Sequence, residues 1–482
     1  MPSFNINDLV SIVPEAMVIA LAMVILVLDV FVSKEQKRYL AYFSIAGLAI
    51  AAYFTFQMRY AMLQPTFSGM FILDNYAIYF KMIFFIAAAL AMLISINYIK
   101  VEGINLGEYY ALILFATTGM MVMASGADLI SIYLGLELMA LSVYIMAGFM
   151  RDSTRSNEAA LKYFLLGAFS SGILLYGISI MYGITGATNL REIASFIQTG
   201  SYSRPALVLS VILMTAGFGF KVAAVPFHMW VPDVYEGAPT SVTAFMSVGP
   251  KAAGFAAFLR VFTEAFPAVR PDWTVIIAAL AILSMLIGNV TAIAQTNIKR
   301  MLAYSSIAHA GYAMVGFVAW GEQGLSSVML YLFIYAFMNL GAFGMVIMLR
   351  KEGVMGEEIS DFAGLAKKNK LAAFLMLVFM FSLAGIPPTA GFVGKFYIFM
   401  AAVNSGYLAL AIIGVIMSAV SAYFYLRVIM VMYMSEPKGE FELSTSPSHS
   451  LALLVAVVAV LYLGMYPTDL LNFARESVIG MM

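Results

Sequence analysis

Long apolar runs with almost no charge in their interior recur along this chain from one end to the other. Crossing a hydrocarbon core takes about 20 apolar residues in one helix. Of the 482 residues 63% are hydrophobic and only 11% are charged, which excludes a water-soluble fold, because soluble domains are about 25% charged. The chain is therefore predicted to be an all-α, polytopic transmembrane bundle of about fourteen helices. The predicted spans are 11–32, 39–58, 74–98, 107–125, 128–149, 157–184, 204–227, 239–263, 273–295, 300–319, 325–349, 371–401, 407–433 and 450–470.

Lysine and arginine are distributed unequally between the loops that join these spans. The even-numbered loops hold only Arg59, Arg191, Arg204, Arg260 and Arg270, whereas the odd-numbered loops hold most of the others. Because loops rich in lysine and arginine stay in the cytoplasm, both termini are predicted to lie on the outer side. The first apolar run is expected to remain as a span, since no basic segment precedes it as in a signal peptide.

The composition also excludes several kinds of chemistry. The sequence has no cysteine, so it can form no disulfide, thiolate zinc site or cysteine-ligated iron–sulfur cluster. There is no P-loop motif and no soluble catalytic domain; the one long polar connection, 350–370, is expected to be a solvated cytoplasmic segment. Acidic and basic residues balance at 26 each, without a basic arm for nucleic acid. We expect no bound cofactor, and the lipid bilayer as the surroundings.

Two of the predicted spans are interrupted by proline in related ways. The seventh contains Pro226 and is followed by Pro232, and the twelfth contains Pro387 and Pro388 between glycines. Proline removes a backbone donor and clashes with the preceding turn, so each helix should break near the middle of the membrane. Such paired breaks favour a transporter built from repeats, with its site at the breaks. Ordinary proline kinks are the simpler alternative.

A few charged residues lie inside the predicted spans, where each costs about 2.5–3.5 kcal/mol on insertion scales. They are Glu137, Lys162, Lys221, Lys251 and Lys395. Such a cost is usually tolerated for function, so these residues are predicted to be the working part of the chain. Burial favours the neutral amine and a nearby carboxylate favours the ammonium. A lysine beside Glu137 can therefore hold or release a proton as their separation changes.

Other polar residues have simpler interpretations. For Lys162 the simpler alternative is a side chain that only extends toward water, and for the other buried charges it is a purely structural ion pair. Lys81 is expected to extend toward the outer interface. Glu15 and Asp29 are expected to be interfacial.

The three histidines are expected in different surroundings. His309 either extends a proton path or is a hydrogen-bonded packing residue. His228 is expected at the outer end of the seventh span, and His449 in a loop.

Three segments resemble the antiporter-like proton-channel subunits of respiratory complex I. They read GFGFKVAAVPFHMWVPDVYEGAPTSVTAFMSVGPKAAGFA, NIKRMLAYSSIAHAGYAMVG and LAGIPPTAGFVGKFYIF, and the resemblance covers nearly the whole chain. In this family the M branch carries glutamate in the twelfth span and the N branch carries lysine. Lys395 therefore makes the chain similar to the N branch, in which spans four to eight and nine to thirteen form inverted repeats. The resemblance implies four parts, at 1–106, 107–263, 264–433 and 434–482.

The resemblance also implies the function. Glu137 and Lys221 would form the charge pair of a first half-channel, Lys251 and His309 would bridge the centre, and Lys395 would end the second half-channel. Lys162 matches a further family lysine. The chain would be a translocase subunit of an NADH-quinone oxidoreductase in a bacterial inner membrane, without redox chemistry of its own. NADH, flavin, iron–sulfur clusters and quinone would be bound by partners, with other membrane subunits on either side.

Three rival functions remain open at this point. A cation/proton antiporter subunit of the multi-subunit type and a hydrogenase-linked relative share the fold, and fold does not fix function. A structural spacer between other membrane subunits is the third, and buried titratable residues in series argue against it.

Overall fold

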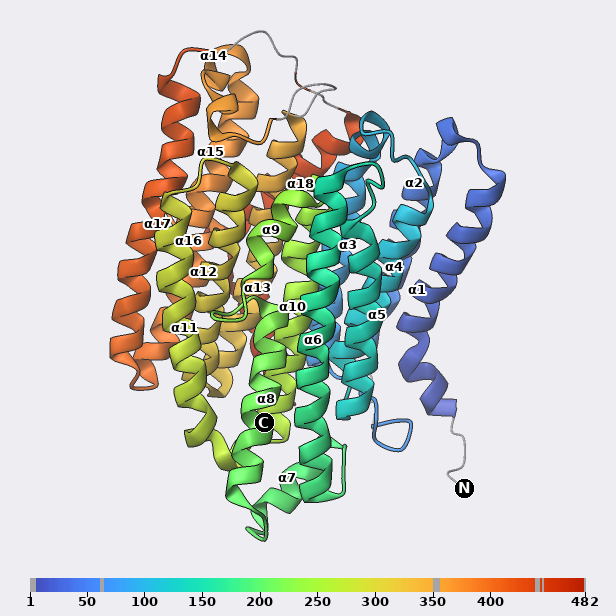
Figure 1. The fold of residues 1–482 in the computed structure, drawn as a ribbon, viewed down its shortest axis with the longest axis vertical. Helices are drawn as coiled ribbons and strands as arrows, with labels where there is room; N and C mark the ends of the chain where they lie inside the picture. The colour runs from blue at the N-terminus through green and yellow to red at the C-terminus, as the bar shows by residue number, and fades with distance from the viewer. Residues whose placement is uncertain (1–5, 61–64, 350–355, 438–442, 444–445, 481–482) are drawn as a thin grey trace.

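The computed structural model describes residues 6–60, 65–349, 356–437, 443 and 446–480, and every regular element within them is a helix (Figure 1). The α-helices are α1 Ile6–Phe31, α2 Arg38–Gln57, α3 Asn75–Val101, α4 Glu108–Ser125, α5 Leu129–Ala147, α6 Thr154–Thr185, α7 Leu190–Gln198, α8 Arg204–Val222, α9 Trp230–Gly237, α10 Thr240–Glu264, α11 Arg270–Ile293, α12 Ile298–Ala319, α13 Gly321–Met348, α14 Leu365–Lys368, α15 Lys370–Ala384, α16 Ala390–Asn404, α17 Leu408–Met434, α18 Pro447–Met465 and α19 Thr468–Ile479.

The all-α, multi-pass architecture expected from the apolar runs is confirmed. Within the described part of the chain, twelve helices are long and apolar enough to cross a membrane. The 18-residue α4 and the pair of 15-residue helices α15 and α16 supply the other two of the fourteen expected segments. The amphipathic α7 and α19 were not expected, because they are short and fall between or after the long apolar runs.

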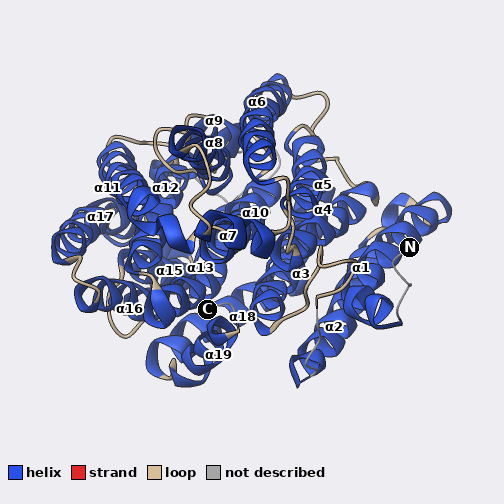
Figure 2. Cartoon of the chain, turned by 90° about the horizontal axis from the view of Figure 1, so that it is seen from below, coloured by secondary structure: helices blue, strands red, loops and turns tan. Residues whose placement is uncertain are grey.

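Helices at the centre of the bundle differ from those at its edge. α10, α12 and α13 are almost entirely buried, while only about a third of α1, α2 and α17 is buried. Seen along the bundle, α10 lies centrally and α1, α2 and α17 lie at the periphery (Figure 2). A helix that is apolar on all sides can face lipid, so exposed residues such as Phe169 and Tyr176 on α6 are expected in a membrane.

Both proline-containing spans are broken, as predicted. α8 ends at Val222, Ala223 adopts a left-handed conformation with φ 65°, and the chain becomes helical again in α9. α15 ends in the same manner at Gly385, with φ 86°, before α16 begins. A left-handed residue is a common way to end a helix, and glycine adopts that conformation without a steric penalty. Each break leaves carbonyl groups at the end of a helix without intrahelical partners.

The polar connection at 350–370 is only partly as expected. Its residues 350–355, which include Arg350 and Lys351, lie outside the described residues, as does Lys438. From Glu357 onward the segment packs on the bundle instead of extending into solvent. The amide of Ile298 donates to the carbonyl of Glu357 at 2.7 Å, and Phe362 is fully buried.

Candidate functional site

Lys221 lies in the last turn of α8, next to the first break, and only 6% of its surface is exposed. Its ammonium donates to the hydroxyl of Tyr144 on α5 at 3.4 Å. Glu137, two turns before Tyr144 on the same helix, lies within electrostatic range of Lys221. The two form no direct ion pair, and Oε1 of Glu137 is buried without a hydrogen-bond partner in the described part of the chain. The carboxylate therefore acts on Lys221 through space.

Two glycines allow the helices around Lys221 to approach closely. A Cβ on Gly167 of α6 would lie 1.9 Å from the hydroxyl oxygen of Tyr144, so only glycine leaves room for that hydroxyl. On α10, a Cβ on Gly254 would lie 3.4 Å from the Cβ of Lys221, which is ordinary contact. Gly254 is one turn from Lys251, so this contact brings the helix that carries Lys251 against the one that carries Lys221.

Lys251 and His309 lie at the centre of the bundle, on α10 and α12. Lys251 is 3% exposed, and its ammonium donates to the backbone carbonyl of Ser306 at 2.6 Å and to the Ser306 hydroxyl. One turn further on, the two ring nitrogens of His309 are hydrogen bonded to the hydroxyls of Tyr331, at 2.5 Å, and Tyr425, at 3.1 Å. His309 lies within electrostatic range of Lys251 and of Lys395. The structure therefore brings His309 near both lysines.

Lys395 lies in α16, just after the second break. Its ammonium donates to the carbonyls of Leu383 at 3.1 Å and Ala384 at 2.8 Å, and to the hydroxyl of Ser418 at 2.9 Å. The two carbonyls are acceptors that the end of α15 leaves without intrahelical partners, so the break itself creates the lysine site. A cavity of about 860 Å³ between α16 and α17 is lined by Lys395, Ser418 and apolar side chains.

These residues share one property that bears on their chemistry. Within the described part of the chain, the ammonium groups of Lys221, Lys251 and Lys395 are hydrogen bonded only to hydroxyl and carbonyl oxygens. Lys251 and Lys395 can each lose a proton without leaving a buried carboxylate unpaired, because no carboxylate in the described part of the chain is bonded to them. We refer to Lys221, Lys251, His309 and Lys395 as the lysine row. Glu137 adds a negative charge near its first member.

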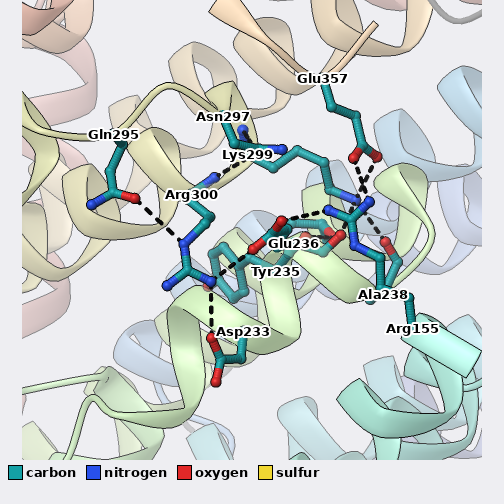
Figure 3. A network of polar contacts seen from close by, with 11 residues as sticks. Arg155, Asp233, Tyr235, Glu236, Ala238, Gln295, Asn297, Lys299, Arg300 and Glu357 are labelled. Atoms are coloured by element: carbon teal, nitrogen blue, oxygen red, sulfur yellow. Dashed lines mark hydrogen bonds and ion pairs between the residues drawn. The ribbon is translucent and has the colours of Figure 1, made fainter. Parts of the chain in front are cut away.

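Lys162 is not brought into this row. Its side chain is 43% exposed, and its ammonium forms ion pairs with Glu158 at 2.8 Å and Asp233 at 3.0 Å. It belongs instead to a network of ion pairs that joins α6, α9, α12 and the segment at Glu357. Figure 3 shows the part of this network around Arg155, Glu236 and Arg300. We call this network the α9 cluster; its members are Arg155, Glu158, Lys162, Asp233, Glu236, Lys299, Arg300 and Glu357.

Sequence reasoning missed most of the α9 cluster and all of the hydroxyl partners of the row. Asp233 and Glu236 follow the proline break directly in the segment PDVYEG, and this acidic pair was the available signal. Tyr425 is 116 residues from His309, and Tyr144 is 77 residues from Lys221. Nothing in the local pattern indicates which hydroxyls reach the lysines.

Several residues lie elsewhere than expected. Lys81 and Glu15 are fully buried and form an ion pair of 2.6 Å between α3 and α1, so Lys81 does not extend to the interface. Two opposite charges can be buried together as an ion pair. Lys81 and Glu15 were considered separately in the sequence, and this pair was therefore not predicted. His449 lies in α18, buried, instead of in a loop, and His228 lies buried in the first break instead of at the outer end.

No group of three histidine, aspartate or glutamate side chains in the described residues is arranged to hold a metal ion. This finding covers the described ranges alone.

The fold and the buried row define a polytopic membrane protein of the ion-transporting class. A family model described as NADH:quinone oxidoreductase/Mrp antiporter, transmembrane, matches residues 126–421. NADH-quinone oxidoreductase subunit N of Trichlorobacter lovleyi is 51% identical, with 98% of each chain covered. The chain belongs to this family of NADH-quinone oxidoreductase and Mrp antiporter membrane subunits.

Two solved structures extend the comparison. A chain of respiratory complex I from Thermus thermophilus is 31% identical, with a TM-score of 0.80, 95% of this chain covered and 98% of that one. A chain of the Mrp complex from a Dietzia species has a TM-score of 0.85 at 20% identity, with 99% and 98% covered, which shows the fold alone.

Proposed function

We propose that this chain is the proton-translocating, N-type membrane subunit of an NADH-quinone oxidoreductase, and that Glu137 and the lysine row carry its protons. The observation that carries the proposal is that all four members of the row are buried and bonded to neutral oxygens. A titratable group inside a membrane protein is costly unless it has a function. Lys162, whose side chain is 43% exposed, would exchange protons between the row and water.

The first half and the second half of the chain have equivalent roles in this proposal. The breaks at Ala223 and Gly385 support two inverted repeats, 107–263 and 264–433, between flanking parts 1–106 and 434–482. Lys221 serves the first repeat, Lys395 the second, and Lys251 with His309 lies between them. The loop charges favour an orientation with both termini outside, and the bacterial relative supports a location in a bacterial inner membrane.

Partner subunits supply the energy in this proposal. They bind NADH, flavin, iron–sulfur clusters and quinone, and this chain does no redox chemistry itself, which makes it the translocase part of the complex. A signal from a neighbouring membrane subunit changes the separation of Glu137 and Lys221. As the carboxylate withdraws, the ammonium loses its stabilising charge and passes a proton toward Lys251. Moving each charge against 100 mV costs about 2.3 kcal/mol, which a local electrostatic change can match.

Lys221→Ala tests the proposal in membrane vesicles that contain the whole complex. Quinone-dependent NADH oxidation and proton pumping are measured together, and assembly is checked on a native gel. Lys367→Ala is the matched control, because Lys367 is 49% exposed and pairs with Glu436, which is itself exposed. We expect Lys221→Ala to assemble and to lose both activities together, with the control unaffected. Wild-type activity in an assembled Lys221→Ala complex would instead favour a structural spacer.

A cation/proton antiporter subunit is the second candidate, because the same fold occurs in the Mrp complex. The two differ in what drives proton movement. The test uses vesicles without NADH that hold a preformed pH gradient. If the chain is an antiporter subunit, added Na⁺ or K⁺ discharges the pH gradient. If our proposal is right, the pH gradient stays unchanged. A discharge that Lys221→Ala abolishes would support the antiporter.

A further inference from the structure

The α9 cluster joins two parts of the chain that carry different members of the lysine row. Arg300, in the first turn of α12, uses one nitrogen to donate to Asp233 at 2.9 Å and to Glu236 at 2.7 Å. Both acceptors are on α9, the short helix that follows the first break. Figure 3 shows Arg300 and both carboxylates within this network.

The neighbouring Lys299 holds the same helix by its end. Its ammonium donates to the backbone carbonyls of Glu236 and Ala238, each at 2.8 Å. These carbonyls lie at the C-terminal end of α9, where partners within the helix are missing and a positive charge is favourable. Two consecutive residues of α12 therefore fix α9 through its side chains and through its backbone.

The other end of α9 holds the turn that carries Lys221. The indole N–H of Trp230, the first residue of α9, donates to the carbonyl of Phe220 at 3.1 Å. Phe220 directly precedes Lys221. The Trp230 ring is stacked on Tyr163, with 4.3 Å between ring centroids, and Tyr163 packs edge-on against Tyr144 at 4.7 Å. Tyr144 is the hydroxyl partner of Lys221.

The same helix α12 also holds Lys251, through Ser306, less than two turns after Arg300. A shift of α12 would therefore act on Lys251 directly and on Lys221 by way of α9. Helices are stiff over this length, and packed interiors transmit such displacements.

We propose that Arg300 is a positioning residue for Lys221: it holds α9, and α9 holds the last turn of α8 and Tyr144 through Trp230. Lys299 shares this task. The inference rests on the proposed function, since it concerns the geometry of the same row. It adds that the separation between Lys221 and Lys251 is set at the α9 cluster, outside the row itself.

Arg300→Gln in the complete complex tests this inference. The readouts are protons pumped per NADH oxidised, the pH profile of pumping, and assembly on a native gel. We expect assembly, a loss of pumping of roughly two-fold or more, and a displaced pH profile. Arg300→Lys should restore most of the activity, because one nitrogen of Arg300 makes both contacts and an ammonium can replace it.

Arg204→Gln is the matched control. Arg204 begins α8, its side chain is 75% exposed, and it pairs with Asp272 near the start of α11, a residue outside the α9 cluster. It should leave pumping and the pH profile unchanged. An assembled Arg300→Gln complex with the wild-type ratio and pH profile would overturn the inference, and so would a loss that Arg300→Lys does not repair.

Trp230→Phe covers the case in which Arg300→Gln fails to assemble. It preserves a stacked ring and removes only the N–H donor to Phe220. We expect the same displaced pH profile of pumping, and an unchanged pH profile would overturn the inference.

Lys221→Ala, measured in the same preparation, separates the two proposals. If Lys221→Ala abolishes pumping while the Arg300 and Trp230 variants do not alter it, only the positioning role fails. If Lys221→Ala has no effect, the proposed function itself fails.

Discussion

Two groups of buried charges in this protein are stabilised in opposite ways. In the lysine row, Lys251 and Lys395 are bonded to hydroxyl and carbonyl oxygens only. In a second region, which we call the paired charges, each buried cation meets carboxylates. Lys81 contacts Glu15 at 2.6 Å, and Arg260, fully buried, contacts Asp74 and Glu264 at 2.7 Å each.

This difference separates charges that hold the fold from charges that can change. A cation paired with a buried carboxylate cannot release its proton without leaving an uncompensated negative charge in the interior. A cation bonded to neutral oxygens leaves only neutral groups when it is deprotonated. Burial alone therefore does not identify a proton carrier, and the kind of partner does.

The largest effect is expected for breaking one of the paired charges. Lys81→Leu leaves the carboxylate of Glu15 buried and unpaired, and such a loss costs about 3–5 kcal/mol. We expect much less assembled complex and a lower thermal midpoint, measured on detergent-solubilised complex. Lys81→Leu combined with Glu15→Leu should recover most of the loss, because an apolar pair can replace a buried ion pair. A double variant as unstable as the single one would show that the pair has another role.

The corresponding change in the lysine row should act on activity instead of stability. Lys395→Met removes the charge and keeps an unbranched side chain of similar length. It leaves no carboxylate unpaired, so we expect assembly and a thermal midpoint at or above the wild-type value. Proton pumping should fall about tenfold or more, as for loss of a proton-transfer group. A large loss of stability with retained pumping would place Lys395 among the structural charges and break the comparison.

Sequence reasoning could find the helices and the buried charges, but not what pairs with them. The apolar runs and Pro226 and Pro388 fixed the spans and both breaks, because length and proline chemistry act locally. Lys81 was assigned to the interface because its partner lies on another helix, 66 residues away. Ser418, Tyr425 and most of the α9 cluster were missed for the same reason. Contacts between helices depend on how the helices pack, and the periodicity of apolar residues along the sequence does not indicate this packing.

A smaller effect is expected from crowding Lys395 without removing it. Gly385 has φ 86°, and a Cβ there would lie 2.9 Å from Cδ of Lys395. Gly385→Ala therefore adds a backbone cost of about 1–2 kcal/mol and displaces the lysine from the carbonyls of α15. Gly406→Ala is the matched control, since Gly406 has φ 85° and open space around its Cβ position. Both variants should lose similar stability, but only Gly385→Ala should also lose pumping. Equal pumping in the two would show that the position of Lys395 is not critical.

The smallest effect on stability is expected for an ion pair that faces solvent, because neither of its charges is buried. Arg204 and Asp272 are 3.1 Å apart, with side chains 75% and 35% exposed. Water already stabilises both charges, so Arg204→Gln should change the thermal midpoint by an amount equivalent to about 0–1 kcal/mol. Any difference from the wild type should shrink further when salt is raised, because exposed charges are screened. A loss comparable to that of Lys81→Leu would mean that a partner chain buries this pair in the assembled complex. In that case Arg204 would belong with the paired charges, since what decides the role of a charge is whether its partner remains in contact with water.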